Sequence, residues 1–109
     1  MHANTSRIRM LNDQFRRTFV GGVVTVTSAV NSLPALTRAR LLYIVRTFNA
    51  FDSDNDPHCE HDFGSVEVES ERYFFKIDYY DRELENGSPD PSDTSLTTRV
   101  LVVMRADEY

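Results

Sequence analysis

The stretch NAFDSDNDPHCEHDFG, residues 49–64, separates a part of the chain with helical patterning from a part with strand patterning. It contains two of the three histidines, the only cysteine and five acidic residues. Aspartate, asparagine and proline are typical of irregular turns, in which Asp and Asn side chains bind backbone N–H groups. The sequence therefore predicts that this stretch is a long loop that leads from helices into a sheet.

The residues before the loop are patterned as a helix, a strand and a second helix. A first series of apolar residues, spaced by three, four and four positions, predicts a helix that Thr5 or Ser6 caps and that the glycine pair 21–22 ends. The series consists of Ile8, Leu11, Phe15 and Phe19. A run of β-branched residues then predicts a strand over 23–28.

The second helix is expected to begin at 32–34, because Pro34 is tolerated in a first turn, and to end near Asn49. Its core-facing stripe consists of Leu41, Ile44, Val45 and Phe48. On the first helix, Asp13 precedes Arg16 and Arg17 by three and four residues. This spacing predicts that the three side chains are neighbours on the exposed side of that helix.

The residues after the loop alternate between apolar and polar, which is typical of strands. Two strands are expected in the segments 66–69 and 73–80, with a turn at Ser70–Glu71. Asn86-Gly87 and two prolines predict a loop over 81–94. The apolar segment 96–104 predicts a strand inside the sheet rather than at its edge.

The predicted order of elements is helix, strand, helix and three strands. This order favours an α+β fold in which two helices pack on one face of a four-stranded, mostly antiparallel sheet. The 109 residues are expected to form a single domain, residues 1–109, with an acidic tail at 106–109 that frays.

Charge is distributed unevenly along the chain. Residues 1–49 hold seven arginines against one aspartate, a net charge of +6, whereas residues 50–109 hold sixteen acids against five basic residues, a net charge of −11. Such asymmetry suggests that the halves pair with each other or that one half meets a charged partner. A single cysteine and the lack of a long apolar run favour a cytoplasmic protein.

Within the loop, alternate aspartates resemble the start of a calcium-binding EF-hand, but Pro57 and Phe63 stand where that loop needs Gly and Glu. His58, His61 and Asp62 are candidate ligands of a divalent transition metal, although no second His/Cys pair completes a structural zinc site. Cys59 with a neighbouring histidine as base is a weak nucleophile candidate, because adjacent side chains rarely face each other. The sequence therefore assigns no catalytic residue.

A structural interpretation of the same loop is that its polar side chains cap turns, with His61 bonded to a carboxylate or carbonyl beneath the sheet. In the segment 76–81, Asp78 lies on the strand face opposite Ile77. If the strand 96–104 lies beside this segment, Arg99 is expected to form an ion pair with Asp78, in a structural role.

Four segments together resemble the bacterial domain of unknown function numbered 3768, a family of small proteins. They are NDPHCEHDFG (55–64), FFKIDYYD (74–81), GSPDP (87–91) and TTRVLVVMRADEY (97–109), and the resemblance runs from about Ile8 to the C-terminus. The matching positions are Asn55, Asp56, Pro57, His58, Glu60, His61, Asp62, Phe63, Gly64, Lys76, Asp78, Tyr79, Tyr80, Asp81, Arg99 and Tyr109. The resemblance places a small residue such as glycine where this chain has Cys59. Short proteins of this kind are associated with mobile elements.

The leading hypothesis is a small, acidic, non-enzymatic protein that needs no cofactor and binds a basic or nucleic-acid-handling partner. An inhibitor of a bacterial defence system, such as an anti-CRISPR or anti-restriction protein, fits this description. The predicted contact residues are Asp52, Asp54, Asp56, Glu67, Glu69, Glu83 and Glu85.

Two other hypotheses remain open. One is a metal-binding module or a metal-dependent hydrolase that uses His58 and His61. The other is nucleic-acid binding through Arg7, Arg9, Arg16, Arg17, Arg38, Arg40 and Arg46, against which the isoelectric point near 5.1 counts. A dimer that joins the basic face of one chain to the acidic face of another is also left open.

Overall fold

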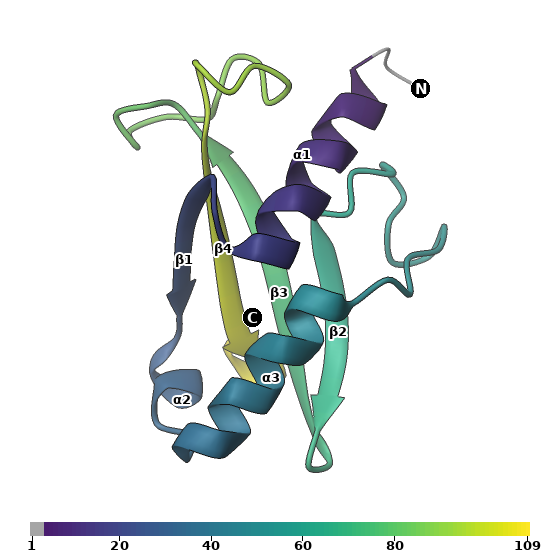
Figure 1. The fold of residues 1–109 in the computed structure, drawn as a ribbon, viewed down its shortest axis with the longest axis vertical. Coiled ribbons are helices and arrows are strands. Elements are labelled where there is room, and N and C mark those ends of the chain that lie inside the picture. The colour runs from purple at the N-terminus through teal and green to yellow at the C-terminus, as the bar shows by residue number, and fades with distance from the viewer. Residues whose placement is uncertain (1–3) are drawn as a thin grey trace.

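The structure is a computed structural model that describes residues 4–109. Its elements are α1 (Thr5–Thr18), β1 (Gly22–Val26), α2 (Ser28–Asn31), α3 (Ala35–Thr47), β2 (Phe63–Val68), β3 (Glu71–Tyr80), β4 (Thr98–Arg105) and the 3₁₀ turn η1 (Ala106–Glu108). The long helices α1 and α3 lie on the same face of the sheet (Figure 1). The predicted α+β fold is therefore confirmed, with the short helix α2 as an element that the sequence pattern did not predict.

The four strands form one mixed sheet in the order β1-β4-β3-β2. The pairs β2/β3 and β3/β4 are antiparallel, and β1 runs parallel to β4. The prediction that the last strand lies inside the sheet is confirmed, because β4 has β1 on one side and β3 on the other. The register pairs Tyr79 with Arg99 and Ile77 with Leu101, so these side chains share the face that the helices cover.

The core lies between that face and the two long helices. Phe75, Leu101 and Val103 of the sheet are 0% exposed, as are Leu41 and Val45 of α3. Leu41 and Val45 belong to the predicted apolar stripe, so the period of 3.6 residues located the buried side of α3 correctly. No helix among the described elements is long and apolar enough to cross a membrane.

The end of α1 differs from the prediction. The helix ends at Thr18, and Phe19, rather than a glycine, adopts the left-handed conformation (φ 58°) while its N–H bonds to the carbonyl oxygen of Phe15. Gly22 has a different role, as the first residue of β1. A Cβ atom there would lie 2.5 Å from the carbonyl oxygen of Arg99 and 2.8 Å from the Phe15 ring. Only glycine therefore permits this approach of β1 to β4 and α1.

Two further boundaries were predicted wrongly. The turn between β2 and β3 consists of Glu69 and Ser70, both at positive φ (52° and 67°), as in a type I′ hairpin turn. The prediction placed this turn one residue too late. The acidic tail does not fray, because it forms η1 and the Tyr109 ring packs edge-to-face against Phe63 and Phe74.

Candidate functional site

The loop between α3 and β2 lies beside α1 on the flank of the molecule (Figure 1). Its own side chains hold its turns. One oxygen of Asp52 accepts hydrogen bonds from the N–H groups of Asp54 and Asn55, and the Asn55 side chain bonds to the N–H of Asp52 and the carbonyl of Ala50. These contacts confirm the interpretation of the loop as a turn and capping segment.

Asp56 holds the second half of the loop. It is 5% exposed, and one carboxylate oxygen accepts hydrogen bonds from the N–H groups of Glu60 and His61, each at 3.1 Å. Asp56, one of the predicted partner-binding residues, is therefore buried against the backbone of its own loop. Cys59 and His61 have positive φ values of 59° and 55°, in the region that favours glycine. This backbone geometry accounts for the small residue that the family resemblance places at position 59.

His61 connects the loop to α1. Its Nδ1 atom lies 2.8 Å from Asp13 Oδ1, and its Nε2 atom lies 3.6 Å from Asp56 Oδ2. The imidazole ring also stacks on the Phe51 ring, with centroids 3.8 Å apart and planes at 5°. The predicted bond to a carboxylate is therefore present, and that carboxylate belongs to a helix.

Arg16 is fully buried under the same loop. Its guanidinium donates to Asp13 Oδ1 at 3.1 Å and to the Phe48 carbonyl at 2.9 Å, and it lies over the rings of Phe51 and Phe75. The ion pair with Asp13 was predicted correctly, but its place on the exposed side of α1 was wrong. Burial lowers the pKa of Arg16, and the hydrogen bond with Asp13 opposes this shift. Asp13 thus joins a buried arginine to the loop histidine.

A second buried polar group joins α1, the loop and the centre of the sheet. Asn12 is 0% exposed and donates from Nδ2 to the Tyr79 hydroxyl oxygen at 2.8 Å and to the Glu60 carbonyl at 2.9 Å. Its oxygen accepts from Arg99 Nε at 2.7 Å, and the Tyr79 hydroxyl donates to Glu60 Oε1 at 2.7 Å. Burial and the bond to Glu60 raise the pKa of Tyr79, so this phenol stays protonated. We call these four residues the Asn12 network.

Sequence reasoning missed the Asn12 network. A signal for it was present, because Asn12 stands between Ile8 and Phe15 at helical spacing on the apolar side of α1. A polar residue in such a stripe needs buried partners.

The predicted ion pair between Arg99 and Asp78 is wrong. In the register of β3 and β4, Asp78 lies opposite Val100, whereas Arg99 lies opposite Tyr79 on the other face. Asp78 instead pairs with Lys76 on its own strand, with 3.0 Å between the charged atoms.

The structure separates the three predicted metal ligands. His61 lines a pocket of about 320 Å³ with Phe51 and Cys59, whereas His58 and Asp62 line another, of about 340 Å³, with Lys76. Burial raises the pKa of Asp62, and the nearby Glu60 raises it further. Within residues 4–109, no group of three or more His, Cys, Asp and Glu side chains is arranged to hold a metal ion. A metal site at these residues therefore stays a prediction without a ligand set.

Cys59 has no catalytic arrangement around it. Over residues 4–109, no hydrogen bond joins its thiol to His58 or His61, and its carbonyl accepts a bond from the Arg9 guanidinium at 3.1 Å. Cys59 thus serves the backbone of the loop rather than a nucleophilic pair.

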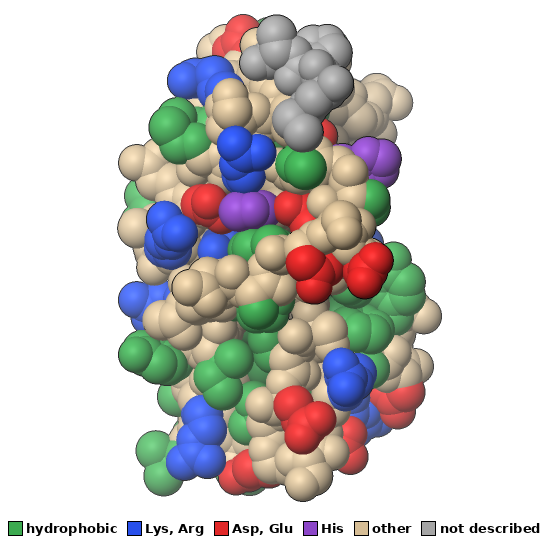
Figure 2. Space-filling view, turned by 90° about the vertical axis from the view of Figure 1, so that its right-hand side faces the viewer, with side chains coloured by type: hydrophobic (Ala, Val, Ile, Leu, Met, Phe, Trp, Pro, Cys, Tyr) green, Lys and Arg blue, Asp and Glu red, His purple; other side chains and the backbone are tan. Residues whose placement is uncertain are grey.

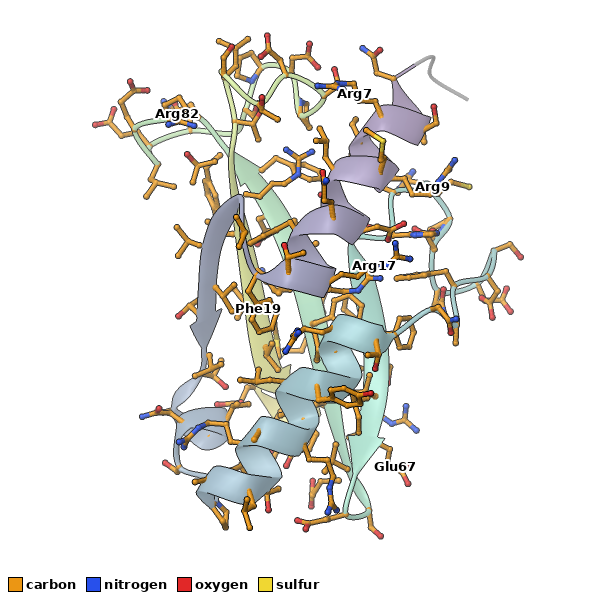
Figure 3. The ribbon with its side chains drawn as sticks, in the orientation of Figure 1. Arg7, Arg9, Arg17, Phe19, Glu67 and Arg82 are labelled. Carbon is orange, nitrogen blue, oxygen red and sulfur yellow. The ribbon has the colours of Figure 1, made fainter. Side chains whose placement is uncertain are left out.

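The remaining predicted contact residues are exposed, but they lie in three separate places. Asp52 and Asp54 belong to the loop after α3, Glu67 and Glu69 to the end of β2 and the turn that follows it, and Glu83 and Glu85 to the loop after β3. In Figure 3, Glu67 and Arg82 mark opposite ends of the molecule, which is 39 Å long. The predicted acidic residues therefore form no single continuous patch.

Most arginines of the first half bind backbone carbonyl oxygens. Arg7 bonds to Ser92, Arg9 to Cys59, Arg38 to Asn31 and Leu33, and Arg46 to Arg17. Figure 2 shows basic side chains along the side of the molecule that carries the helices and acidic ones toward the middle and the lower end. Arg16 is buried. Among the exposed arginines of α1 and α3, Arg17 and Arg40 have guanidinium groups that bind no other residue in the described range.

Comparison with known proteins gives one match. The model of a family described as "Protein of unknown function (DUF3768)" matches residues 26–108. Neither the curated proteins nor the solved structures include a match to this chain. The matched segment covers most of the chain, from the end of β1 through η1, and includes the loop and all of β2, β3 and β4. The chain therefore belongs to the DUF3768 family.

Proposed function

We propose that this protein is a non-enzymatic binding protein that contacts a basic partner protein through its exposed carboxylates. The observation that supports this proposal is the contrast between its two kinds of charge. Most arginines of the first half, though not Arg17 and Arg40, are held against carbonyl oxygens, whereas Asp54, Glu83 and Glu85 have side chains without a hydrogen bond or ion pair in the described part of the chain. The charges that are free to meet a partner are therefore mainly negative.

The polar groups of the loop favour binding over catalysis. Asp13, Asp56 and His61 bond to one another or to the backbone, and Glu60 belongs to the Asn12 network. A catalytic base or nucleophile has to be within reach of a reacting atom. In this protein the side chains of Asp13, Asp56 and His61 instead form the contacts that hold the loop on α1.

The two ends of the molecule offer separate contact surfaces. One is the turn end of the β2–β3 hairpin, where Glu67, Glu69 and Glu71 are exposed, although Glu67 pairs with Arg72 and Glu69 accepts a hydrogen bond from Thr37. The other is the loop after β3, where Glu83 and Glu85 are exposed. An acidic surface is attracted to basic channels and steers association. A nucleic-acid-handling complex of a bacterial defence system, whose channel is built to hold phosphates, is the partner class that we propose.

Capture experiments with charge-reversed variants test this proposal. The full-length chain is immobilised and exposed to nuclease-treated bacterial lysate, and any captured protein is then purified and titrated directly. Glu67→Lys/Glu69→Lys and Glu83→Lys/Glu85→Lys make the same change of charge at opposite ends. The corresponding glutamine variants are the matched neutral controls.

We expect one lysine pair to weaken binding of a basic partner by at least about tenfold and its glutamine pair to weaken it less, because two charges are reversed rather than removed. Binding by all four variants at the wild-type affinity would contradict the proposal. So would a captured partner that is itself acidic.

A further inference from the structure

A cavity of about 500 Å³ lies between α1, the start of β1 and the loop before β4. Its lining combines apolar and uncharged polar side chains with one cation. The lining residues are Leu11, Gln14, Phe15, Thr18, Val20, Gly21, Thr94 and Arg99. Sites for small molecules have this size and this mixture of apolar walls with few polar groups.

Arg99 brings a positive charge to this cavity although it is 3% exposed. Its Nε donates to Asn12 Oδ1, its Nη2 donates to the Pro91 carbonyl, and its guanidinium lies over the Tyr79 ring. All these partners are neutral, and no carboxylate forms an ion pair with Arg99 within residues 4–109. A buried charge without an opposite charge is costly, so an anion bound beside it is favoured.

One nitrogen of Arg99 is free to bind such an anion. Nη1 donates no hydrogen bond to any residue of the described range. The buried side-chain nitrogen or oxygen that lacks a partner in that range is Arg16 Nε. Arg99 Nη1 likewise has no hydrogen-bond partner within residues 4–109, and Arg99 lines the cavity.

The other charges near this cavity leave its Arg99 end positive. Burial lowers the pKa of Arg99 most, Tyr79 and Glu60 raise it, and the charge of Arg7, which bonds to the Ser92 carbonyl, lowers it again. The acids of the loop before β4, Asp90 and Asp93, accept hydrogen bonds from their own turns. The Glu60 carboxylate also acts on Arg99, and it accepts a hydrogen bond from the Tyr79 hydroxyl.

We propose that this cavity binds a small organic carboxylate with an apolar body, whose carboxylate accepts hydrogen bonds from Arg99 Nη1 and whose body packs against Leu11 and Phe15. A guanidinium edge suits a carboxylate. The C-terminal end of α1 also borders the cavity at Thr18, and the negative end of its dipole opposes a doubly charged phosphate more than a singly charged carboxylate. The ligand class is thus a monoanion that is apolar at one end.

The test compares hexanoate with hexanamide and inorganic phosphate as probes of the full chain in a chloride-free buffer. Binding is followed by titration calorimetry and by backbone NMR shifts. We expect hexanoate to bind at least about tenfold more tightly than hexanamide, with shifts at Leu11, Phe15, Thr94 and Arg99. Equal binding of hexanoate and hexanamide, no binding of hexanoate, or tighter binding of phosphate would each overturn the proposal.

Replacing Arg99 directly would also break the Asn12 network. A pair of variants at a neighbouring residue therefore tests the role of the Arg99 charge alone. Thr94 is exposed at the rim of the cavity, and its side chain forms no hydrogen bond in the described range. Thr94→Glu places a carboxylate near Arg99, and Thr94→Gln is its neutral match. We expect Thr94→Glu to weaken hexanoate binding about tenfold more than Thr94→Gln, with hexanamide unaffected. Equal effects of the two variants on hexanoate would contradict a role for Arg99.

Discussion

Replacing Asn12 with alanine should remove a large part of the stability of this protein. Asn12 is fully buried and makes three hydrogen bonds, to Arg99, Tyr79 and the Glu60 carbonyl. A hydrogen bond to a charged group contributes about 1.5–3 kcal/mol, and each neutral one about 0.5–1.5 kcal/mol. The higher helix propensity of alanine offsets about half a kcal/mol of this loss in the free energy of unfolding. The expected loss in the free energy of unfolding is therefore about 3 kcal/mol.

Urea unfolding followed by circular dichroism measures this loss. Because small domains have a total stability of about 5–15 kcal/mol, a loss of about 3 kcal/mol lowers the midpoint strongly while the slope is unchanged. Gln14→Ala on the exposed side of α1 is the control and should stay within about 0.5 kcal/mol of the wild type. Asn12→Asp keeps the acceptor for Arg99 but loses both donors, so its loss should be intermediate.

A loss below about 1 kcal/mol for Asn12→Ala, similar to that of the Gln14 control, would refute the reasoning. It would mean that Arg99, Tyr79 and Glu60 find other partners without cost. The account of how the loop is held on α1 would then rest on Asp13 and His61 alone.

Three further predictions concern the backbone of the loop, the backbone of the β2–β3 turn, and the half-buried Asp62. Cys59→Gly should raise the free energy of unfolding by about 0.5–1 kcal/mol relative to Cys59→Ala, because position 59 has a positive φ; equal stabilities would contradict this. Glu69→Asn with Ser70→Gly should stabilise the protein by about 1 kcal/mol in urea unfolding, because both residues have positive φ in a type I′ turn; a lower midpoint would argue against that turn. Burial raises the pKa of Asp62, so its contribution to stability falls as the pH rises from the unfolded-state to the folded-state pKa. Asp62→Asn should therefore be more stable than the wild type at neutral pH and lose this advantage in acid, and a difference independent of pH would contradict the shift.

The periodic parts of the chain could be predicted from sequence. Leu41 and Val45 on α3, and the alternation of Tyr73, Phe75 and Ile77 on β3, place the core where the structure has it. Local spacing was sufficient there because each element buries its side chains against a single layer.

The candidate site could not be predicted in the same way. Arg16 and Asn12 are polar residues of α1, and the partners that bury them come from segments distant in the chain, which local spacing does not identify. Asn12 and Arg99 are 87 positions apart, and Asp13 and His61 are 48 positions apart. Turn positions such as Glu69 were missed because a positive φ in a residue other than glycine leaves little trace in the sequence.

The measurement that tests the proposed function most directly is the affinity of the purified partner, at low and high salt, for the wild type, for the lysine pairs at residues 67/69 and 83/85, and for His58→Ala. His58 is exposed and belongs to the metal-site hypothesis, so its replacement is a control that should not affect binding through the carboxylates. We predict that one lysine pair loses at least about tenfold in affinity, that high salt weakens the wild type, and that His58→Ala binds normally. Wild-type affinity in both lysine pairs, together with a loss on changing His58, would contradict the account.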